Sequence, residues 1–364
     1  MKMRANFKLL LLALTLSIAL ALGGCGAGNG AGAASGSSGS NASGSSGAAA
    51  TPALKVVTTV FAPYDFARQI GGAQVEASML LPPGVESHGF EPTPRDLLSI
   101  QECDLFIYIG GESETWVSDV LDSLDLQKTR VLQLMDSVSL LEEEIVEGME
   151  PEEEEEADHA AADAASADAS GAASASAEAD EHAAEGEEVA YDEHIWTSPE
   201  NAKKMVKAIS EALCALRPAE ASQFQERTQA YLTQLDELDA ALHETVAAGV
   251  RKTIVFGDRF PFRYLTDELG LSYYAAFPGC SSETEAKPAT VAFLIDKVKA
   301  ERLPVIFKIE MSNTDIAQTI AEETGAALRN LHSLHNLSES EVSSGATYLS
   351  IMWDNVAALK EALD

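Results

Sequence analysis

The sequence predicts an α/β protein with two lobes, each built on a parallel β-sheet that is covered by helices. In both halves of the chain, short apolar and β-branched runs alternate with stretches of helical length, which is typical of parallel sheets. Between the halves lies a stretch of nearly 30 residues with leucines at helical spacing, including Leu235, Leu238 and Leu242. A helix of that length runs for about 40 Å, so we expect it to reach from one lobe to the other.

The first 25 residues are typical of a secretory signal and not of the fold. Three basic residues precede an apolar run at Leu9–Leu22, and the segment ends in Leu-Gly-Gly-Cys at Cys25. The apolar run has 14 residues, fewer than the roughly 20 that span a bilayer. We therefore expect cleavage before Cys25 and a lipid on its thiol, as at a bacterial lipobox. Residues 26–52 are mostly Gly, Ala and Ser, which predicts a flexible tether.

The first lobe is predicted over residues 53–216 and the second over residues 250–364, with the linker helix at 217–249. In the first lobe we expect strands at 55–61, 76–81, 104–109 and 131–134, and helices at 63–70, 94–101, 116–124 and 199–216. In the second we expect strands at 253–256, 272–276, 305–309 and near Ala327, and helices at 262–269, 290–300, 315–324 and 348–363.

The net charge of −34 is concentrated in one segment. Between Glu142 and Glu193 there are 21 acidic residues and no Lys or Arg, so the rest of the chain carries a net charge of −13. Residues 142–190 are rich in Ala, Ser, Asp and Glu with His159 and His182, and we expect a disordered loop. Its role stays open between a solvated insertion and a weak metal-gathering element. The sequence has no basic stripe, so we expect no nucleic-acid partner.

Three cysteines follow Cys25, at Cys103, Cys214 and Cys280. Their number is odd, their spacing is wide and no Cys-x-x-Cys pair occurs. They therefore predict neither a disulfide framework nor a thiolate metal site.

Two histidines stand in nearly parallel contexts, each just ahead of a helix start. His88 follows an expected strand and precedes the helix that opens at Thr93, with a proline next and Asp96 three residues on. His194 precedes Thr197–Glu200, which has the form of a second capping box. Open α/β sheets bind ligands beyond the carboxyl ends of their strands. A single histidine there is more often structural, but two in company predict a binding site.

Further candidate ligands follow the strands of the second lobe. Asp258 comes after the first of these strands, Glu310 after the third, and His332 and His335 after the short last one. Together with the two histidines of the first half they make a mixed set of imidazoles and carboxylates where the lobes would meet. Imidazole nitrogen with one or two carboxylate oxygens suits Zn²⁺ in a tetrahedral site, whereas a larger share of oxygen suits Mn²⁺. The sequence therefore predicts a divalent-metal site.

The segments ESHGFEPTPRD, DEHIWTSPENA and AYLTQLDELDAAL resemble the zinc and manganese solute-binding lipoproteins of bacterial ABC importers. The similarity covers nearly all of residues 52–364. It implies two Rossmann-like lobes with parallel sheets, joined by one long rigid helix, and a metal held in the cleft between the lobes by histidines and a carboxylate. It also implies a monomer, anchored by its lipid on the outer face of the cytoplasmic membrane, that delivers the metal to an ABC permease.

By this resemblance His88 and His194 are metal ligands, because the motifs around them match those of the family. Zinc members usually carry a third histidine after the first strand of the second lobe. Here that place reads Gly257–Tyr264, GDRFPFRY, and contains no histidine.

The family's last carboxylate ligand falls about where His332 stands. We therefore expect His332 to supply the third imidazole, with Glu310 or Asp258 as the carboxylate. His335 lies three residues further into a loop, and we expect it to contribute much less.

Other functions fit the sequence less well. A zinc hydrolase needs an open coordination position and a general base, and the sequence contains neither H-E-x-x-H nor G-x-S-x-G, so we expect no enzyme. A metal-dependent surface adhesin would share the lipid anchor but would present an exposed apolar patch, and a receptor for an iron chelate would need arginines or aromatics at the cleft. We therefore expect an extracytoplasmic protein that captures zinc, with a manganese-binding member of the same family or an adhesin as alternatives.

Overall fold

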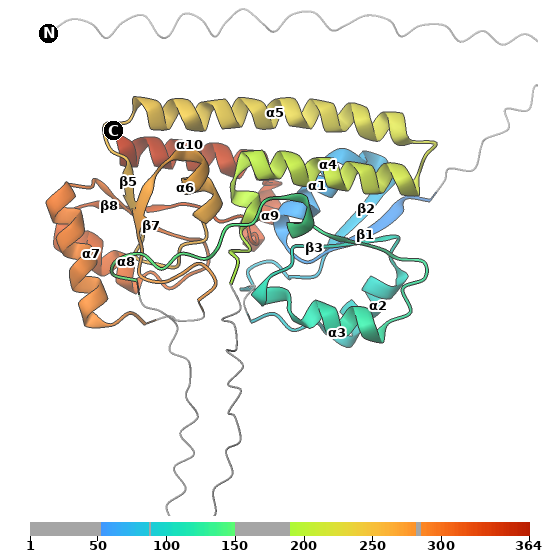
Figure 1. The fold of residues 1–364 in the computed structure, drawn as a ribbon, viewed down its shortest axis with the longest axis horizontal. Helices are drawn as coiled ribbons and strands as arrows, with labels where there is room; N and C mark the ends of the chain where they lie inside the picture. Colours follow the sequence, from blue (N-terminus) through green and yellow to red (C-terminus); the bar gives the residue numbers. More distant parts are fainter. Residues whose placement is uncertain (1–51, 87–88, 150–189, 282–284) are drawn as a thin grey trace, which may run out of the picture. The chain divides into compact units, whose positions relative to one another are not determined.

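The computed structural model describes residues 52–86, 89–149, 190–281 and 285–364, which all belong to one compact unit. The signal segment with Cys25, the tether, His88 and most of the acidic segment lie outside the described residues. The predicted α/β class with parallel sheets and two lobes is confirmed (Figure 1).

The first lobe is a four-stranded parallel sheet with helices on both faces. Its strands are β1 (Leu54–Thr58), β2 (Val75–Met79), β3 (Leu105–Tyr108) and β4 (Arg130–Gln133), and its helices include α1 (Phe61–Gly71), α2 (Pro94–Glu102) and α3 (Trp116–Ser123). The strand order is β2-β1-β3-β4. Because successive strand residues face opposite sides, Val56 packs into the core on the α1 face and Val57 into the core under α2 and α3.

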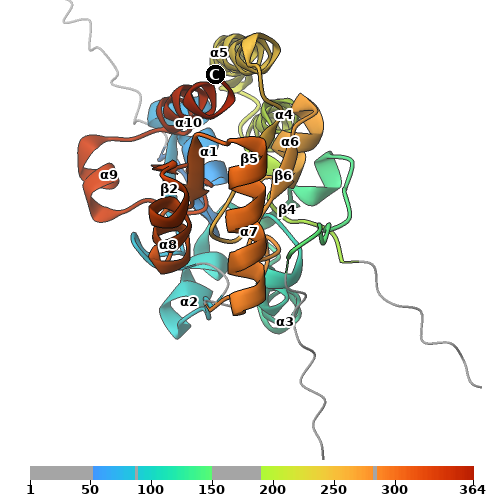
Figure 2. The same cartoon turned by 90° about the vertical axis from the view of Figure 1, so that its left-hand side faces the viewer.

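The second lobe repeats this arrangement. Its strands are β5 (Thr253–Val255), β6 (Ser272–Tyr274), β7 (Val305–Lys308) and β8 (Ala327–Asn330), and its helices include α6 (Arg263–Leu269), α7 (Pro288–Glu301) and α8 (Asp315–Thr324). β5 pairs with β6 and β7 with β8, all parallel, and a parallel bridge between Phe256 and Phe307 joins the two pairs. The helices α7 and α8 pack against each other beside this sheet (Figure 2).

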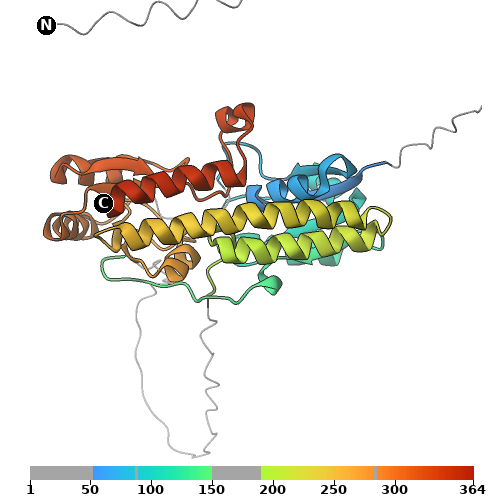
Figure 3. The ribbon, with the colours of Figure 1, turned by 90° about the horizontal axis from the view of Figure 1, so that it is seen from above.

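Three long helices together cover the two sheets on one side: α4 (Pro199–Leu216), α5 (Ala221–Ala248) and α10 (Tyr348–Leu363). α5 has 28 residues, which corresponds to about 42 Å. It packs against α4 along one part and against α10 along another (Figure 3). It also contacts α1 in the first lobe and α6 in the second, so the predicted helix that reaches from lobe to lobe is confirmed. Within the described ranges, no helix is both long and apolar enough to cross a membrane.

The cap of α4 differs from the prediction. The cap residue is Ser198, whose hydroxyl accepts a hydrogen bond from the backbone N–H of Asn201 at 3.1 Å. Thr197 lies one residue earlier in a 3₁₀ turn, and its hydroxyl donates to the carbonyl of His194 at 2.9 Å. The predicted cap at Thr93 with Asp96 is confirmed as a capping box.

Two further segments are more ordered than the sequence pattern predicts. The acidic segment is ordered from residue 142 to Met149, because Glu142 bridges to Tyr191 and Glu143 accepts a hydrogen bond from the backbone of Cys280. A short helix, α9 (Glu339–Ser344), follows β8. Its sequence, ESEVSS, has no apolar periodicity, and a capping box at its start defines it instead.

Candidate metal centre

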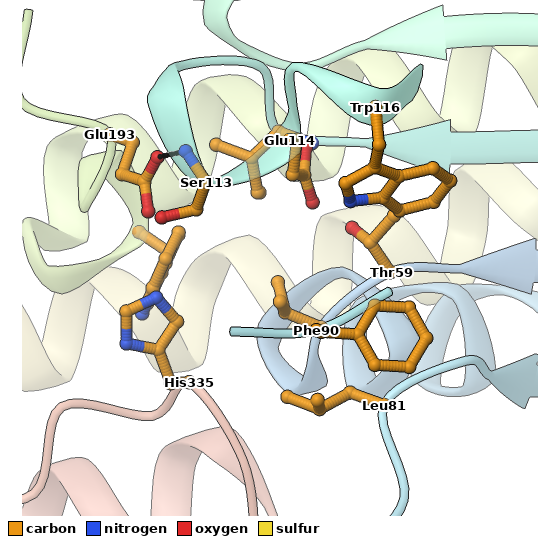
Figure 4. Close-up of a pocket in the computed structure, with 11 residues that line it drawn as sticks. Thr59, Leu81, Phe90, Ser113, Glu114, Trp116, Glu193 and His335 are labelled. Atoms are coloured by element: carbon orange, nitrogen blue, oxygen red, sulfur yellow. Dashed lines mark hydrogen bonds between the residues drawn. The ribbon is translucent and has the colours of Figure 1, made fainter. Parts of the chain in front are cut away.

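A cavity lies at the carboxyl ends of β1 and β3, where the strand order of the first sheet reverses. Such a reversal is where open α/β sheets bind ligands. The cavity is small, because the volume open to the centre of a water molecule is about 20 Å³. Its polar lining residues are Thr59, Ser113, Glu114, Glu193 and His335. Figure 4 shows Glu193 and His335 at one end of the cavity and the rings of Phe90 and Trp116 at the other.

Three side chains that could ligate a metal ion meet at the polar end of this cavity. One ligating atom from each of Glu193, His194 and His335 lies within 4.8 Å of the other two, and all three residues are buried. The rings of His194 and His335 are edge to face with centroids 4.7 Å apart. Two imidazoles and a carboxylate in this arrangement form a donor set that suits zinc.

The orientation of His194 is fixed by Asp192. The Asp192 carboxylate lies 3.0 Å from Nδ1 of the ring and accepts the backbone N–H of His194 at 2.8 Å. A carboxylate on Nδ1 favours the tautomer in which Nε2 carries the lone pair, as in many metal-binding histidines. Burial lowers the pKa of His194, but the charge and hydrogen bond of Asp192 outweigh that effect, so the pKa is raised.

Negative charge gathers around the two imidazoles. Glu193 accepts the backbone N–H of Ser113 at 3.0 Å, and burial raises its pKa. Glu114 is a third buried carboxylate near this cluster and Glu143 is partly buried, and burial raises the pKa of both, that of Glu114 to about 7. Buried carboxylates are costly unless a proton, a hydrogen bond or a cation neutralises them. A divalent cation between them would therefore be strongly favoured.

The segment that carries His335 is tied to the first lobe. The His335 carbonyl accepts the backbone N–H of Phe61, the first residue of α1, at 2.8 Å. The Asn336 side chain donates to the carbonyls of Pro82 and Val85 at 2.6 and 2.9 Å. These bonds hold the segment after β8 against the loop after β2, so the second half of the chain contributes an imidazole to a cavity of the first.

The loop after β2 leads toward His88, which itself lies outside the described residues. On one side of it, Glu86 forms an ion pair with Arg259 of the second lobe at 2.8 Å. On the other side, Phe90 lines the cavity. One flank of His88 thus lies in the cavity wall and the other lies against the second lobe.

His332, the expected third imidazole, lies outside the cluster of Glu193, His194 and His335. It is buried, and its Nδ1 accepts the backbone N–H of Leu334 at 2.9 Å. Its two ring nitrogens lie 3.4 Å from Glu310 and 3.3 Å from Glu341. Glu310 in turn accepts the backbone N–H and hydroxyl of Ser333 at 2.7 and 2.5 Å. In the described residues these groups shape the segment after β8, and His335 is the histidine that lies beside His194.

Asp258 also makes contacts that shape a loop. One oxygen accepts the backbone N–H of Arg259 at 2.9 Å, and the other accepts the backbone N–H of Ile309 at 3.0 Å and the hydroxyl of Ser312. The preceding residue, Gly257, stands where zinc members of the family usually carry a histidine. A Cβ at this position would lie 2.7 Å from the backbone nitrogen of Ala317 in α8.

The sequence prediction did not include Glu193 and gave His335 a minor part. Glu193 directly precedes a predicted ligand, and neighbouring side chains on an extended chain point to opposite sides, so local sequence gives no sign that both reach the same cavity. For His335, the sequence offers one signal: it lies between Leu334 and Leu337, two of three regularly spaced leucines that are all buried, Leu331 being the first. Leu334 has a positive φ of 62°, which turns the chain between His332 and His335.

Comparison with known proteins matches a family model described as "Zinc-uptake complex component A periplasmic" over residues 56–362. The high-affinity zinc uptake system protein ZnuA of Bacillus subtilis (strain 168) is 31% identical over 310 residues, which are 85% of this chain and 88% of that protein. The zinc-binding lipoprotein AdcA of Streptococcus pneumoniae (strain ATCC BAA-255 / R6) is 30% identical over 311 residues, which are 85% of this chain and 56% of that protein. The chain thus spans about half the length of AdcA.

A solved structure shares the fold. The crystal structure of the Zn(II)-bound ZnuA-like domain of Streptococcus pneumoniae AdcA matches with a TM-score of 0.65 at 28% sequence identity. The match covers 86% of this chain and 99% of that domain.

Proposed function

This chain belongs to the zinc-uptake complex component A family, and we propose that it captures one Zn²⁺ outside the cytoplasm and delivers it to an ABC importer. The observation that carries the proposal is the buried cluster of Glu193, His194 and His335 at the ligand-binding edge of the first sheet. The relatives ZnuA and AdcA, which are named as zinc-uptake and zinc-binding proteins, support the choice of metal.

The proposed ligands are His88, His194 and His335, with Glu193 as the carboxylate. His88 completes the set because its flanking residues Glu86 and Phe90 lie against the second lobe and in the cavity wall. Three imidazoles and one carboxylate give a closed, nitrogen-rich tetrahedral site, which favours Zn²⁺ over Mn²⁺. A closed site fits a carrier better than a hydrolase, because a zinc hydrolase keeps one coordination position open for water.

His332, Glu310 and Asp258 have supporting roles in this proposal. Glu310 holds the backbone at Ser333, and Asp258 holds the backbone at Ile309. Both carboxylates fix loops at the ends of second-lobe strands, and the segment after β8 carries His335. Their loss would disturb zinc binding through the path of the chain.

The finer features of location and partner follow from the sequence and the family. We propose that Cys25 carries the lipid, that residues 26–52 form the tether, and that the monomer works at the outer face of the cytoplasmic membrane. Its partner is the permease of an ABC transporter. Labelling cells with a radioactive fatty acid tests the anchor, and a Cys25→Ala variant that still incorporates label would contradict it.

Metal-dependent unfolding of the purified chain tests the zinc proposal. At a zinc concentration about 1,000 times the dissociation constant, binding raises the free energy of unfolding by about 4 kcal/mol. The control is Mn²⁺ at the same concentration, for which a much smaller rise is expected. No rise with zinc would contradict the proposal, and a larger rise with manganese would favour an oxygen-rich site that includes Glu310 and Asp258.

A further inference from the structure

A second group of metal-binding side chains lies on α5, away from the cavity. Asp239 and His243 are four residues apart on this helix and therefore share one face. Glu268 reaches the same place from α6. One ligating atom of each residue lies within 4.8 Å of the other two, and Nε2 of His243 lies 3.3 Å from Oδ1 of Asp239.

Each carboxylate of this group uses one oxygen for protein contacts. Oδ2 of Asp239 binds Nζ of Lys203 at 3.1 Å. Oε2 of Glu268 accepts the hydroxyl of Ser198 and, at 3.4 Å, the backbone N–H of Glu200. These contacts hold both carboxylates in place, which is the usual role of groups behind a metal ligand.

The other two carboxylate oxygens point into the group. Oδ1 of Asp239 and Oε1 of Glu268 are buried atoms that accept no hydrogen bond within the described ranges. Two buried carboxylate oxygens that approach each other need a proton or a cation between them. The imidazole of His243 beside them makes a metal cation a suitable one.

We propose that Asp239, His243 and Glu268 form a second, weaker site for a divalent metal of the zinc type, separate from the proposed transport site. One imidazole nitrogen and two carboxylate oxygens match zinc ligation, with the remaining position open to water. Tetrahedral zinc requires its ligand atoms about 3.3 Å apart at bond lengths of about 2.0–2.1 Å, which is the distance between Nε2 of His243 and Oδ1 of Asp239. The His243 side chain is 53% exposed, so it has room to adjust as a metal binds.

The same exposure and the nearby cation Lys203 make this site weaker than the buried one. Lys203 also contacts Glu200 and Asp236 at 2.5 and 2.9 Å, so it competes for the negative charge around Asp239. The site joins three helices, because Ser198 caps α4 while the ligands come from α5 and α6. A bound metal would therefore fasten α6 of the second lobe to the linker helix.

Isothermal titration of the purified metal-free chain with Zn²⁺ tests the proposal. We expect a tight event and a second, weaker event. His243→Ala should weaken the second event at least tenfold and leave the first unchanged, and Glu268→Gln should act in the same way. The matched control is Glu244→Gln, which removes an exposed carboxylate next to His243 on the same helix.

Three results would overturn the proposal. They are the absence of a second event, a second event that His243→Ala leaves unchanged, and an equal loss in Glu244→Gln. If His243→Ala leaves the second event unchanged, deletion of residues 150–188 shows whether that binding belongs to the acidic segment instead, because it then disappears with the segment. His194→Ala separates the two proposals, since it should abolish the tight event and spare the second.

Discussion

Replacing His335 with alanine should reduce zinc affinity by about 100- to 1,000-fold. Structural zinc sites gain about 10–16 kcal/mol, which over four ligands is about 2.5–4 kcal/mol for each, and every 1.4 kcal/mol is about tenfold. His335, whose ring centroid lies 4.7 Å from that of His194, is one of the four proposed ligands, so its loss should cost that share. His332→Ala should change affinity less than tenfold, because His332 contacts Glu310 and Glu341 instead.

Without metal, we expect the opposite order for stability: His332→Ala should destabilise the fold more than His335→Ala. His332 is 4% exposed, accepts the backbone N–H of Leu334 and lies between two carboxylates, so its removal leaves that buried N–H without its acceptor and costs about 1–3 kcal/mol. Competition with a chromophoric zinc chelator measures affinity, and urea unfolding of the metal-free chain measures stability. A loss of 100-fold in His332→Ala together with near-normal affinity in His335→Ala would refute the assignment and restore His332 as the third imidazole.

Three other predictions follow from the contacts. Asp192→Asn should weaken zinc binding about 10- to 100-fold by disturbing the tautomer of His194, measured by the same competition, and an unchanged affinity would speak against that role. The pair of His332 and Glu341 should stabilise the fold most between about pH 4.5 and 6.5. The hydrogen bond from His332 lowers the pKa of Glu341 from 4.5 to about 2, so the contribution of Glu341 is lost as the pH falls from 4.5 to 2. The pKa of His332 is raised, so the contribution of His332 is complete below pH 6.5 and is lost as the pH rises through its raised pKa. Urea unfolding of Glu341→Gln across pH should show a deficit of about 1 kcal/mol in this window, and a deficit that grows above pH 8 would contradict the sign. Deleting residues 150–188 should leave the thermal stability and the tight zinc site intact, and a large fall in either would show that this segment supports the fold.

The sequence predicts most of the fold because its elements carry local signals. β3 is an apolar run, β1 and β7 are apolar apart from a lysine and a threonine at most, and α2 opens with Thr93, Pro94 and Asp96, whose capping box forms as predicted. The linker helix α5 follows from its leucine spacing. Where two adjacent residues carry the same signal, as Thr197 and Ser198 do ahead of α4, local pattern does not choose between them, and contacts from Glu268 favour Ser198.

Which of the two histidines at the end of the second lobe faces the cavity depends on contacts with distant parts of the chain, which local sequence does not reveal. His332 and His335 both follow β8, and their side chains diverge because the chain turns at Leu334. The path of this segment is set by bonds from Phe61, which precedes it by more than 270 residues, and to the loop at Pro82. The short helix α9 begins directly after this segment. Its capping box is a local sequence signal that the segment ends there.

The packing at Gly257 limits which residues can follow the first strand of the second lobe. Any side chain at that position would drive a Cβ into the backbone of α8 at Ala317, and a helix backbone yields far less readily than a side chain. A histidine introduced there would therefore first require a shift of α8. An engineered zinc site in this protein is better built from the loops that end near the cavity than from residue 257.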